Sequence, residues 1–330
     1  MKPFAIGIEI GGTKLQVGVS AADGMLAKVV RAPVVAALGA AGIRQALLAL
    51  VDTACQAASL PLPAVNRIGI GFGGPVDAVR GVTLRSFQIA GWENFPLRDW
   101  AEGQWGKPVA VENDAATAGL AEWSHGSGRG YARVFYVTIG SGVGGGWIVN
   151  GTLDHGQGIG CAEIGHVWVP DPHSGQLTEL EQICSGWSIG RRARAAAQTG
   201  HTSMTTLAGS IQAIDARVVY AAAEQGDGVA ARLLDETCQA LGLAIGTVIT
   251  LLHPEVVIIG GGVSQMGARF WDLLREQIEL RTLPLFRSRV QVVPAGLGED
   301  VVVIGALCLG EDGSHVNSPA SPPTSAARRS

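Results

Sequence analysis

The amino-acid sequence predicts an α/β protein in which mixed sheets are flanked by helices. Two observations favour this class over an all-β barrel. The first three strand-like runs follow one another through short turns, as in an antiparallel meander, and later strands alternate with helical patterns. A chain of 330 residues with 47% hydrophobic residues is also long enough for two domains with separate cores.

The elements are expected in a definite order along the chain. Apolar and β-branched runs predict strands at residues 3–10, 14–20, 25–31, 67–72, 108–112, 133–139, 143–149, 255–259 and 290–294. Helical periodicity predicts helices at about 41–58, 96–105, 114–124, 186–198, 228–252, 266–280 and 300–310. Residues 311–330 are rich in Ser and Pro without apolar periodicity, and we expect them to be disordered.

Charge and apolar patterning exclude several classes of protein. The formal net charge is −4, from 24 basic and 28 acidic residues, so nothing predicts binding to nucleic acid or to a membrane surface. Polar residues are expected to interrupt every apolar run before the roughly 20 residues of a membrane span. The first ten residues do not form a signal peptide, because their apolar run passes into Glu9 and a glycine turn.

The cysteines indicate a reducing compartment. The five cysteines, at positions 55, 161, 184, 238 and 308, are odd in number and include no C-x-x-C pair. Scattered thiols of this kind are typical of reduced cysteines, most of which fill core space. We therefore expect a cytoplasmic protein.

Near the start of the chain, AIGIEIGGTKLQVGVS reads as a strand, a tight turn and a second strand. A hairpin turn needs only Gly or Asn. This one carries Gly11, Gly12, Thr13 and Lys14 directly after Glu9. Glycines let backbone N–H groups approach phosphate oxygens, and a hydroxyl adds a donor, so the turn is expected to hold an anion. A purely structural hairpin with a surface lysine remains the alternative.

A second glycine turn lies in VFYVTIGSGVGGGWIVNG. Gly140, Gly142 and Gly145 match the dinucleotide fingerprint G-x-G-x-x-G, but that site requires a helix directly after the glycines. Here the chain continues as a strand, which excludes a nicotinamide site. A P-loop is also excluded, because the Gly-Lys pair at 106–107 runs into a proline. We expect Gly140, Ser141 and Gly142 to bind an anion together with the first turn.

The stretch ENDAATAGLAE places Asn113 and Asp114 between the end of a strand and the start of a helix. Both residue types are favoured helix N-caps, and a cap alone would explain either of them. Only one of two adjacent residues can cap, so the other can face a binding site. A carboxylate near a helix N-terminus is expected to stay ionised and can accept a hydroxyl proton.

The stretch CAEIGHVW supplies Glu163 and His166. They could be surface residues of one helix, or the histidine could lie in a core. The glycines at 156, 158, 160 and 165 disfavour a helix, so we expect both side chains to extend from a loop into a pocket. Carboxylate acceptors and an imidazole donor suit adjacent hydroxyl groups of a hexose.

A series of motifs in this chain resembles the ROK sugar kinases, which share the two-domain ATPase fold of actin, hexokinase and the heat-shock chaperone ATPases. Besides the two glycine turns, the motifs are IGIGFGGPVD, VENDAATAGLAEW, GIGCAEIGHVWV, LEQICSG and PEVVIIGGGVS, and the resemblance covers residues 4–310. It implies an actin-like (ribonuclease H-like) fold with the active-site cleft between an N-terminal domain, residues 1–112, and a C-terminal domain, residues 113–299. The helix near 300–310 is expected to rejoin the first domain.

The resemblance also implies roles for individual residues. The two glycine turns would clasp the phosphates of ATP, one from each domain, and Gly260, Gly261 and Gly262 would lie beside the adenosine. Asp114 would be the catalytic base. The sugar site would consist of Gly74, Asn113, Glu163, His166 and Glu181. A solvated charge on a short helix remains the alternative for Glu181.

The chain departs from the family pattern at three places. Many members bind zinc through a histidine equivalent to His166 and a C-x-C-x4-C cluster. Residues 167–183 contain no cysteine, so we expect no zinc. Glu9 replaces the usual Asp, and it is expected to reach Mg²⁺ through a water. Gln88 stands where the family often has Asn, which bears on the choice of sugar.

The expected activity is transfer of the γ-phosphate of ATP, with Mg²⁺, to the 6-hydroxyl of a hexose by a cytoplasmic homodimer. Glucose is the first expected substrate, followed by N-acetylglucosamine or N-acetylmannosamine, and then fructose or allose. A ROK repressor is disfavoured because the first strand is expected to begin by Phe4, which leaves no room for a helix-turn-helix. A catalytically weak sugar sensor is the other alternative. Glu9 favours it, whereas Asn113, Asp114 and both glycine turns argue against it.

Overall fold

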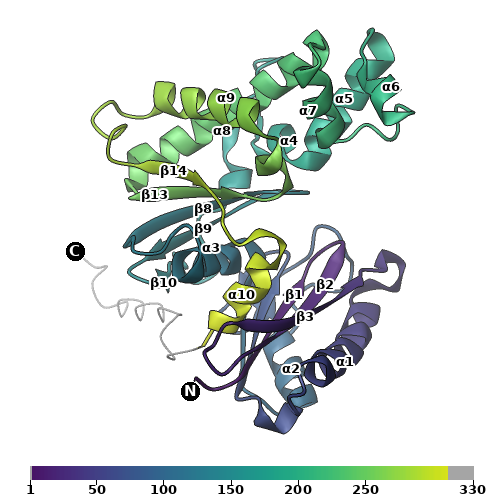
Figure 1. Ribbon diagram of the computed structural model, residues 1–330, viewed down its shortest axis with the longest axis vertical. Coiled ribbons are helices and arrows are strands. Elements are labelled where there is room, and N and C mark those ends of the chain that lie inside the picture. The colour runs from purple at the N-terminus through teal and green to yellow at the C-terminus, as the bar shows by residue number, and fades with distance from the viewer. Residues whose placement is uncertain (1, 311–330) are drawn as a thin grey trace, which may run out of the picture.

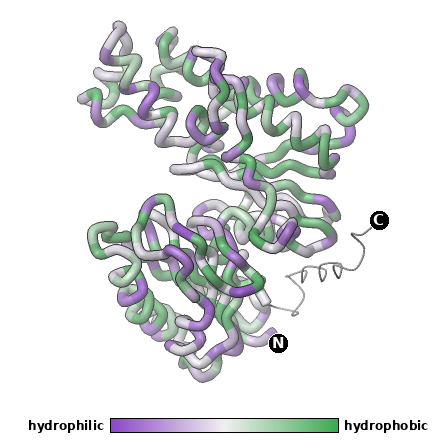
Figure 2. The backbone as a smooth tube through the Cα atoms, turned by 180° about the vertical axis from the view of Figure 1, so that it is seen from behind, coloured by the Kyte–Doolittle hydropathy of each residue, from purple (hydrophilic) through white to green (hydrophobic). Residues whose placement is uncertain are grey.

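The computed structural model describes residues 2–310 as two lobes, each built around a five-stranded sheet with helices packed on it (Figure 1). Figure 2 shows the same two lobes from behind, with hydrophobic and hydrophilic residues interspersed along the chain. The predicted α/β class with mixed sheets is confirmed. The predicted disorder of residues 311–330 falls outside the described residues.

The sheet of the N-terminal lobe has the strand order β3-β2-β1-β4-β7. Its strands are β1 (Ala5–Ile10), β2 (Lys14–Ser20), β3 (Leu26–Pro33), β4 (Arg67–Phe72) and β7 (Val109–Asn113). The first three form the predicted antiparallel meander, and β4 and β7 extend the sheet in parallel on the other side of β1. The helices α1 (Gly39–Ala57) and α2 (Leu97–Trp105) pack on this sheet.

The sheet of the C-terminal lobe repeats this plan in the order β10-β9-β8-β13-β14. Its strands are β8 (Arg133–Ile139), β9 (Val143–Val149), β10 (Thr152–Leu153), β13 (Val256–Gly260) and β14 (Gln291–Pro294). β8 and β9 form an antiparallel hairpin, and β13 and β14 add parallel strands beside β8. The two glycine turns therefore occupy equivalent places, at the tips of the β1–β2 and β8–β9 hairpins.

Both faces of the second sheet are covered by helices, which explains its apolar sequence. In β13, Val257 and Ile259 pack in the cluster that includes residues of α8 (Gly228–Leu252) and α9 (Ala268–Arg281). Ile258 packs on the other face with residues of α3 (Asp114–His125). A strand buried on both faces reads as a continuous apolar run, as VVIIG does.

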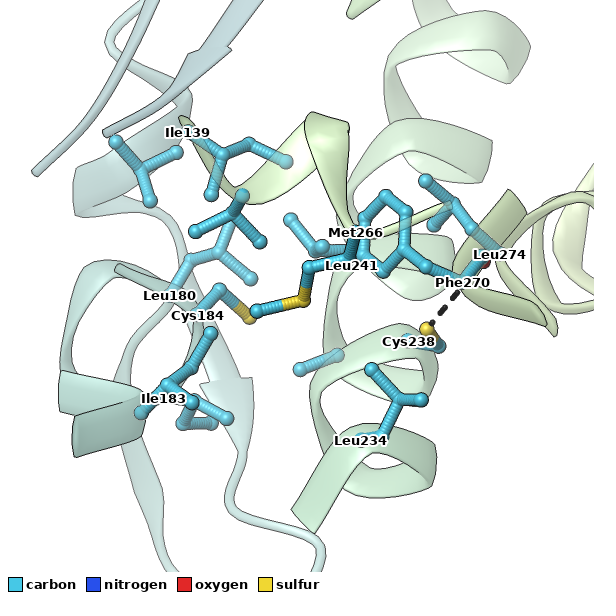
Figure 3. Close-up of a cluster of buried hydrophobic side chains, with 14 of the residues drawn as sticks. Ile139, Leu180, Ile183, Cys184, Leu234, Cys238, Leu241, Met266, Phe270 and Leu274 are labelled. Atoms are coloured by element: carbon cyan, nitrogen blue, oxygen red, sulfur yellow. Dashed lines mark hydrogen bonds between the residues drawn. The ribbon is translucent and has the colours of Figure 1, made fainter. Parts of the chain in front are cut away.

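The remaining elements are short or lie at the end of the C-terminal lobe. They are β5 (Val76–Asp77), β6 (Val82–Thr83), β11 (Trp168–Pro170), β12 (Leu177–Glu179), α4 (Glu181–Cys184), α5 (Gly186–Thr199), α6 (Met204–Ala208) and α7 (Ala216–Glu224). Figure 3 shows the core between α4, α8 and α9, where the Cys238 thiol donates to the Phe270 carbonyl at 3.8 Å. Within residues 2–310 the five cysteines form no disulfide, and four of them are buried.

Two helices join the lobes. α3 packs on β8 and β9 of the second sheet, α10 (Val301–Cys308) packs on β1 and β4 of the first, and α3 and α10 contact each other. Gly7 and Gly69 make room for α10, because a β-carbon at either position would collide with its backbone. These contacts support the proposed division at residue 112, with α10 rejoined to the first domain.

Arg44, Gln45 and Asp52 interrupt the apolar stretch Ala36–Ala57, as expected. By length and composition alone, this helical stretch could still cross a membrane, since a window within it has a mean hydropathy of 1.2. In the structure α1 packs on β2 and β3, and Leu47, Val51 and Ala54 are fully buried there. Packing against the sheet accounts for its apolar residues.

Candidate active site

Asn113 and Asp114 lie where β7 ends and α3 begins, as predicted. Asn113 is the N-cap, and its Oδ1 accepts hydrogen bonds from the amides of Ala115 at 2.9 Å and Ala116 at 3.1 Å. Its Nδ2 donates to the Gly74 carbonyl at 3.1 Å. The amide group keeps one N–H that has no partner among residues 2–310.

Asp114 is left free by this cap to face a ligand. Its Oδ1 accepts the Ala115 amide at 2.8 Å, and its Oδ2 points toward Gly73, where a β-carbon would lie 3.4 Å away. Burial raises the pKa of Asp114 to about 7, and the negative charges of Glu9 and Glu163 add to the shift. The expectation that the helix N-terminus keeps Asp114 fully ionised is therefore wrong. A carboxyl group with this pKa is instead poised to exchange a proton near neutral pH.

Glu9 is buried on β1 and has one oxygen already paired. Gln16 Nε2 donates to its Oε2 at 2.5 Å, and Lys14 Nζ lies 3.6 Å from the same oxygen. Burial raises the pKa of Glu9, although Lys14 and Gln16 oppose the shift. The other oxygen, Oε1, faces the first glycine turn, where a β-carbon on Gly11 would lie 3.5 Å away.

The first glycine turn is closed by its own backbone and flanked by two long side chains. The Gly11 amide donates to the Lys14 carbonyl at 3.1 Å, and Thr13 is exposed at the tip. Lys14 Nζ also donates to the Glu299 carbonyl at 3.3 Å, so its charge is directed toward Glu9 and the start of α10. Gln88 lies directly over Gly12, because a β-carbon on Gly12 would collide with its amide oxygen.

The second glycine turn meets two other segments. The Gly140 carbonyl accepts the amide of Gly186, the first residue of α5, at 2.7 Å. A β-carbon on Gly261 would lie 2.5 Å from the Ile139 carbonyl oxygen, so the Gly260–Gly262 run passes beside the same turn. The structure thus brings together the turn, the triple glycine and the start of α5. The start of α5 carries no sequence signal that would have predicted this position.

Open space lies above this junction. A β-carbon built on Gly140 or on Gly262 would meet nothing within 4 Å, and Ser141 is exposed between the two glycines of the turn. Gly260, in contrast, is required by packing, because a β-carbon there would lie 2.5 Å from the Tyr136 hydroxyl. The exposed Ser141 and the open space at Gly140 and Gly262 fit a phosphate-bearing ligand.

Glu181 contacts the second turn and is not simply a solvated charge. It begins α4 and is partly buried, and its Oε2 accepts the Val143 amide at 2.8 Å. A β-carbon on Gly142 would lie 2.5 Å from the same oxygen. The carboxylate therefore sits at the edge of the turn, and its charge also reaches Glu163.

Glu163 precedes a single turn of 3₁₀-helix, Ile164–His166, and His166 is the last residue of that turn. The predicted absence of an α-helix is confirmed. Glu163 keeps much of its surface exposed. Nearby atoms still displace enough water to raise its pKa; the Glu181 charge adds to this shift and His166 opposes it. His166 Nδ1 lies 3.4 Å from Glu179 Oε2, and its ring centroid lies 5.9 Å from that of Phe87 in the N-terminal lobe.

Close contacts and charge interactions connect predicted site residues of the two lobes. A β-carbon on Gly73 would touch both the Asp114 carboxylate and the Gly11 backbone, which places Asp114 beside the first turn. The charge of Asp114 interacts with that of Glu163. Glu163 in turn interacts with Glu181, which holds the second turn.

Glycines in β9 explain how α3 reaches this position. A β-carbon on Gly144 would lie 2.8 Å from Ala115 Cβ, and one on Gly146 would lie 3.0 Å from Ala116 Cα. The glycine run that matched a dinucleotide fingerprint therefore lets the first turn of α3 lie against β9. It continues as a strand, as predicted.

A cavity of about 730 Å³ lies elsewhere, at the other end of α3 from Asp114. Its walls include Trp123, Tyr131 and Asn150. Beside the candidate site lies a buried pair that was not predicted, Glu112 and His155. Glu112 lies within the motif VENDAATAGLAEW, directly before the two site residues, and this adjacency was the only signal available for it.

Two sheets of the same plan, each with a glycine turn at the tip of its first hairpin and a carboxylate beside that turn, define an actin-like ATPase fold. Comparison with protein families matches residues 5–312 to the ROK family. A glucokinase of Thermotoga maritima is 34% identical over 307 residues, which cover 91% of this chain and 95% of that protein. The chain therefore belongs to the ROK family.

Solved structures agree with this assignment. A ROK glucokinase of Streptomyces griseus, solved with glucose and AMPPNP, superimposes with a TM-score of 0.79 at 33% identity, covering 93% of this chain and 98% of that one. A ROK hexokinase of Thermus thermophilus superimposes with a TM-score of 0.76 at 28% identity, covering 92% and 96%.

Proposed function

We infer that this chain is an ATP-dependent hexose kinase that phosphorylates the 6-hydroxyl of glucose. The observation that carries this inference is the place of Asp114, a carboxyl group with a pKa of about 7 that lies beside the first glycine turn. Its charge interacts with Glu163, whose charge interacts with Glu181 at the second turn. Its relatives include the Thermotoga maritima glucokinase and the Streptomyces griseus glucokinase that binds glucose and AMPPNP.

The sugar would bind between Asn113 and the Glu163–His166 turn. The unpartnered N–H of Asn113 can donate to one hydroxyl, and the carboxylate of Glu163 and the ring of His166 can bind others. Glu181 would complete the site from the edge of the second turn, and the backbone at Gly74 would line it. That backbone is tightly packed, because a β-carbon added at Gly74 would lie only 2.6 Å from the Arg85 carbonyl oxygen.

Asp114 would accept the proton of the 6-hydroxyl as its oxygen attacks the γ-phosphorus of ATP. The new bond forms between that oxygen and phosphorus, and the bond to the bridging oxygen breaks, so ADP leaves. Amides of both glycine turns would stabilise charge on the transferring oxygens, since fixed donors act strongly where water is excluded. The run Gly260–Gly262 would lie beside the adenosine.

The residues at the first turn fit a magnesium ion held through water. Among residues 2–310 no group of three or more His, Cys, Asp or Glu is arranged as a metal cage. Mg²⁺ commonly binds through one or two carboxylates, waters and substrate phosphates, and Glu9 Oε1 faces the turn where those phosphates would lie. When bound, the ion would supply positive charge to the phosphates. A bound zinc is not expected, because no thiolate follows His166 up to residue 183.

Release of ADP with a panel of hexoses tests this function. We expect glucose to give the highest kcat/KM, with N-acetylglucosamine, N-acetylmannosamine, fructose and allose well below it. Sugar binding by calorimetry without ADP release would instead establish a sugar sensor. The cytoplasmic location and the homodimer stay predictions, and size-exclusion chromatography with light scattering tests the second.

A further inference from the structure

Two buried ionisable residues outside the roles assigned above join the two lobes. Glu112 lies on β7, the edge strand of the first sheet, and His155 follows β10, the edge strand of the second. His155 Nε2 and Glu112 Oε2 are 2.5 Å apart, and each residue is only 4% exposed. Charged residues are rarely buried unless they are paired, and removing one partner leaves the other uncompensated.

The carboxylate of Glu112 is held at both oxygens beside the proposed base. While Oε2 binds His155, Oε1 accepts the backbone amide of Asn113 at 2.8 Å. Glu112 therefore fixes the peptide that leads into the N-cap of α3. Asn113 in turn caps the helix that begins at Asp114.

The backbone of His155 stabilises the loop that leads to Glu163. Its carbonyl accepts the amides of Gly158 at 2.8 Å and Gly160 at 3.2 Å, and the Cys161 thiol donates to the Asp154 carbonyl at 2.9 Å. These bonds close a compact loop, residues 155–161, shortly before Glu163. Ala162 links this loop to Glu163 and has a φ of 62°, and the absence of a β-carbon at Gly145 makes room for its carbonyl.

We propose that Glu112 and His155 are a positioning pair, which fixes the distance between the strand that carries Asn113 and Asp114 and the loop that carries Glu163. Neither side chain need touch the sugar. They act through the Asn113 amide on one side and through the 155–161 loop on the other. This inference rests on the proposed roles of Asn113, Asp114 and Glu163.

The charges around the pair favour an ionic bond. Burial alone would lower the pKa of His155, but the hydrogen bond to Glu112, the Glu112 charge and the Asp154 charge raise it. The backbone of Leu153 also favours the protonated ring. These interactions favour the protonated imidazole, and removing either member of a buried pair leaves the other member uncompensated.

Steady-state kinetics of His155→Ala, His155→Gln and Glu112→Gln test the proposal, with His201→Gln as the control, because His201 is exposed. Misplacement of reacting groups by about 1 Å can cost roughly 10²-fold, so we expect kcat/KM for glucose to fall by about 10- to 100-fold in each variant. The fall should combine a higher KM for glucose with a lower kcat, while the KM for ATP stays near that of the wild type. His155→Gln, which keeps a donor, should lose less than His155→Ala.

A double variant, Glu112→Gln with His155→Ala, tests whether the two residues act as a unit. We expect its kcat/KM for glucose to be no lower than that of the worse single variant, because either change already breaks the pair. A double variant whose loss of kcat/KM equals the product of the two single losses would overturn the proposal. The proposal would also be overturned if the pair variants had lower melting temperatures than His201→Gln but the same kcat and KM for glucose. The pair would then contribute only to stability.

If His155→Ala does not fold, His155→Gln and Glu112→Gln decide by the same kinetic criteria.

Two outcomes separate this inference from the proposed function. A wild-type protein that releases no ADP with any hexose overturns the proposed function. An active wild type whose pair variants match His201→Gln overturns this inference alone.

Discussion

The carboxylate of Glu122, on α3, accepts the backbone amide of Gly296 at 2.9 and 3.1 Å to its two oxygens. It also accepts the amides of Leu297 at 2.9 Å and Ser127 at 2.8 Å, and it is fully buried. The residues around Gly296 connect β14 to α10. The helix that starts at Asp114 therefore also holds the second connection between the lobes.

The first prediction follows from this contact. Glu122→Gln replaces one acceptor oxygen with an NH₂ group that faces backbone donors, so at least one amide loses its partner. Leaving a buried group unsatisfied costs about 1–3 kcal/mol, and we expect the free energy of unfolding in urea to fall by that amount. Glu276→Gln, on an exposed face of α9, is the matched control and should change little. Equal unfolding midpoints for the two variants would contradict the account.

The second prediction concerns pH. Asp114 acts as a base only when it is deprotonated, and its pKa is about 7. The kcat/KM for glucose should therefore rise with pH and level off above about 7. Glu9 raises this pKa, so Glu9→Gln should move the rising limb to lower pH. A pH profile that is flat through 7 in the wild type would remove Asp114 as the titrating group.

The third prediction concerns magnesium. If Glu9 Oε1 orients a water on the ion, Glu9→Ala should raise the Mg²⁺ concentration needed for half-maximal activity and lower kcat. Glu9→Asp keeps a carboxylate and should remain active. Affinity for glucose, measured by calorimetry without nucleotide, should change little in both variants. Magnesium titrations of Glu9→Ala that overlay those of the wild type would make Glu9 merely a strand residue paired with Gln16 and Lys14.

The fourth prediction separates two carboxylates of the proposed sugar site. Glu163→Gln should weaken glucose binding by about 1–3 kcal/mol and leave the KM for ATP unchanged, because Glu163 has no contact with a glycine turn in the structure described. Glu181→Gln should raise both KM values, because Glu181 also holds the Val143 amide beside the second turn. Identical effects of the two substitutions on ATP would contradict these assignments.

Much of the fold could be predicted because the long elements carry strong periodic signals. The predicted strand 67–72 coincides with β4, and the predicted helix 228–252 coincides with α8. The short helices α6 and α7 and the hairpin β11–β12 were missed, because so few residues carry too little periodicity to distinguish them from loops.

The sequence supplied candidate site residues but not their electrostatics. The sequence places Asn113 and Asp114 at a helix start, but the pKa of Asp114 depends on Glu9 and Glu163, which lie far away in the sequence. Glu122 reads in the sequence as an ordinary helix residue, and only the fold brings Gly296 to it. Contacts between distant segments leave no local pattern.

The measurement that tests the central claim most directly is the turnover of Asp114→Asn with saturating ATP, Mg²⁺ and glucose. The change is nearly isosteric, and Asn113 rather than Asp114 caps α3, so the fold should tolerate it. General-base catalysis contributes about 10²- to 10⁴-fold, and we expect kcat to fall by that factor while glucose affinity changes far less. An Asp114→Asn enzyme that phosphorylates glucose at a near wild-type rate would contradict the account.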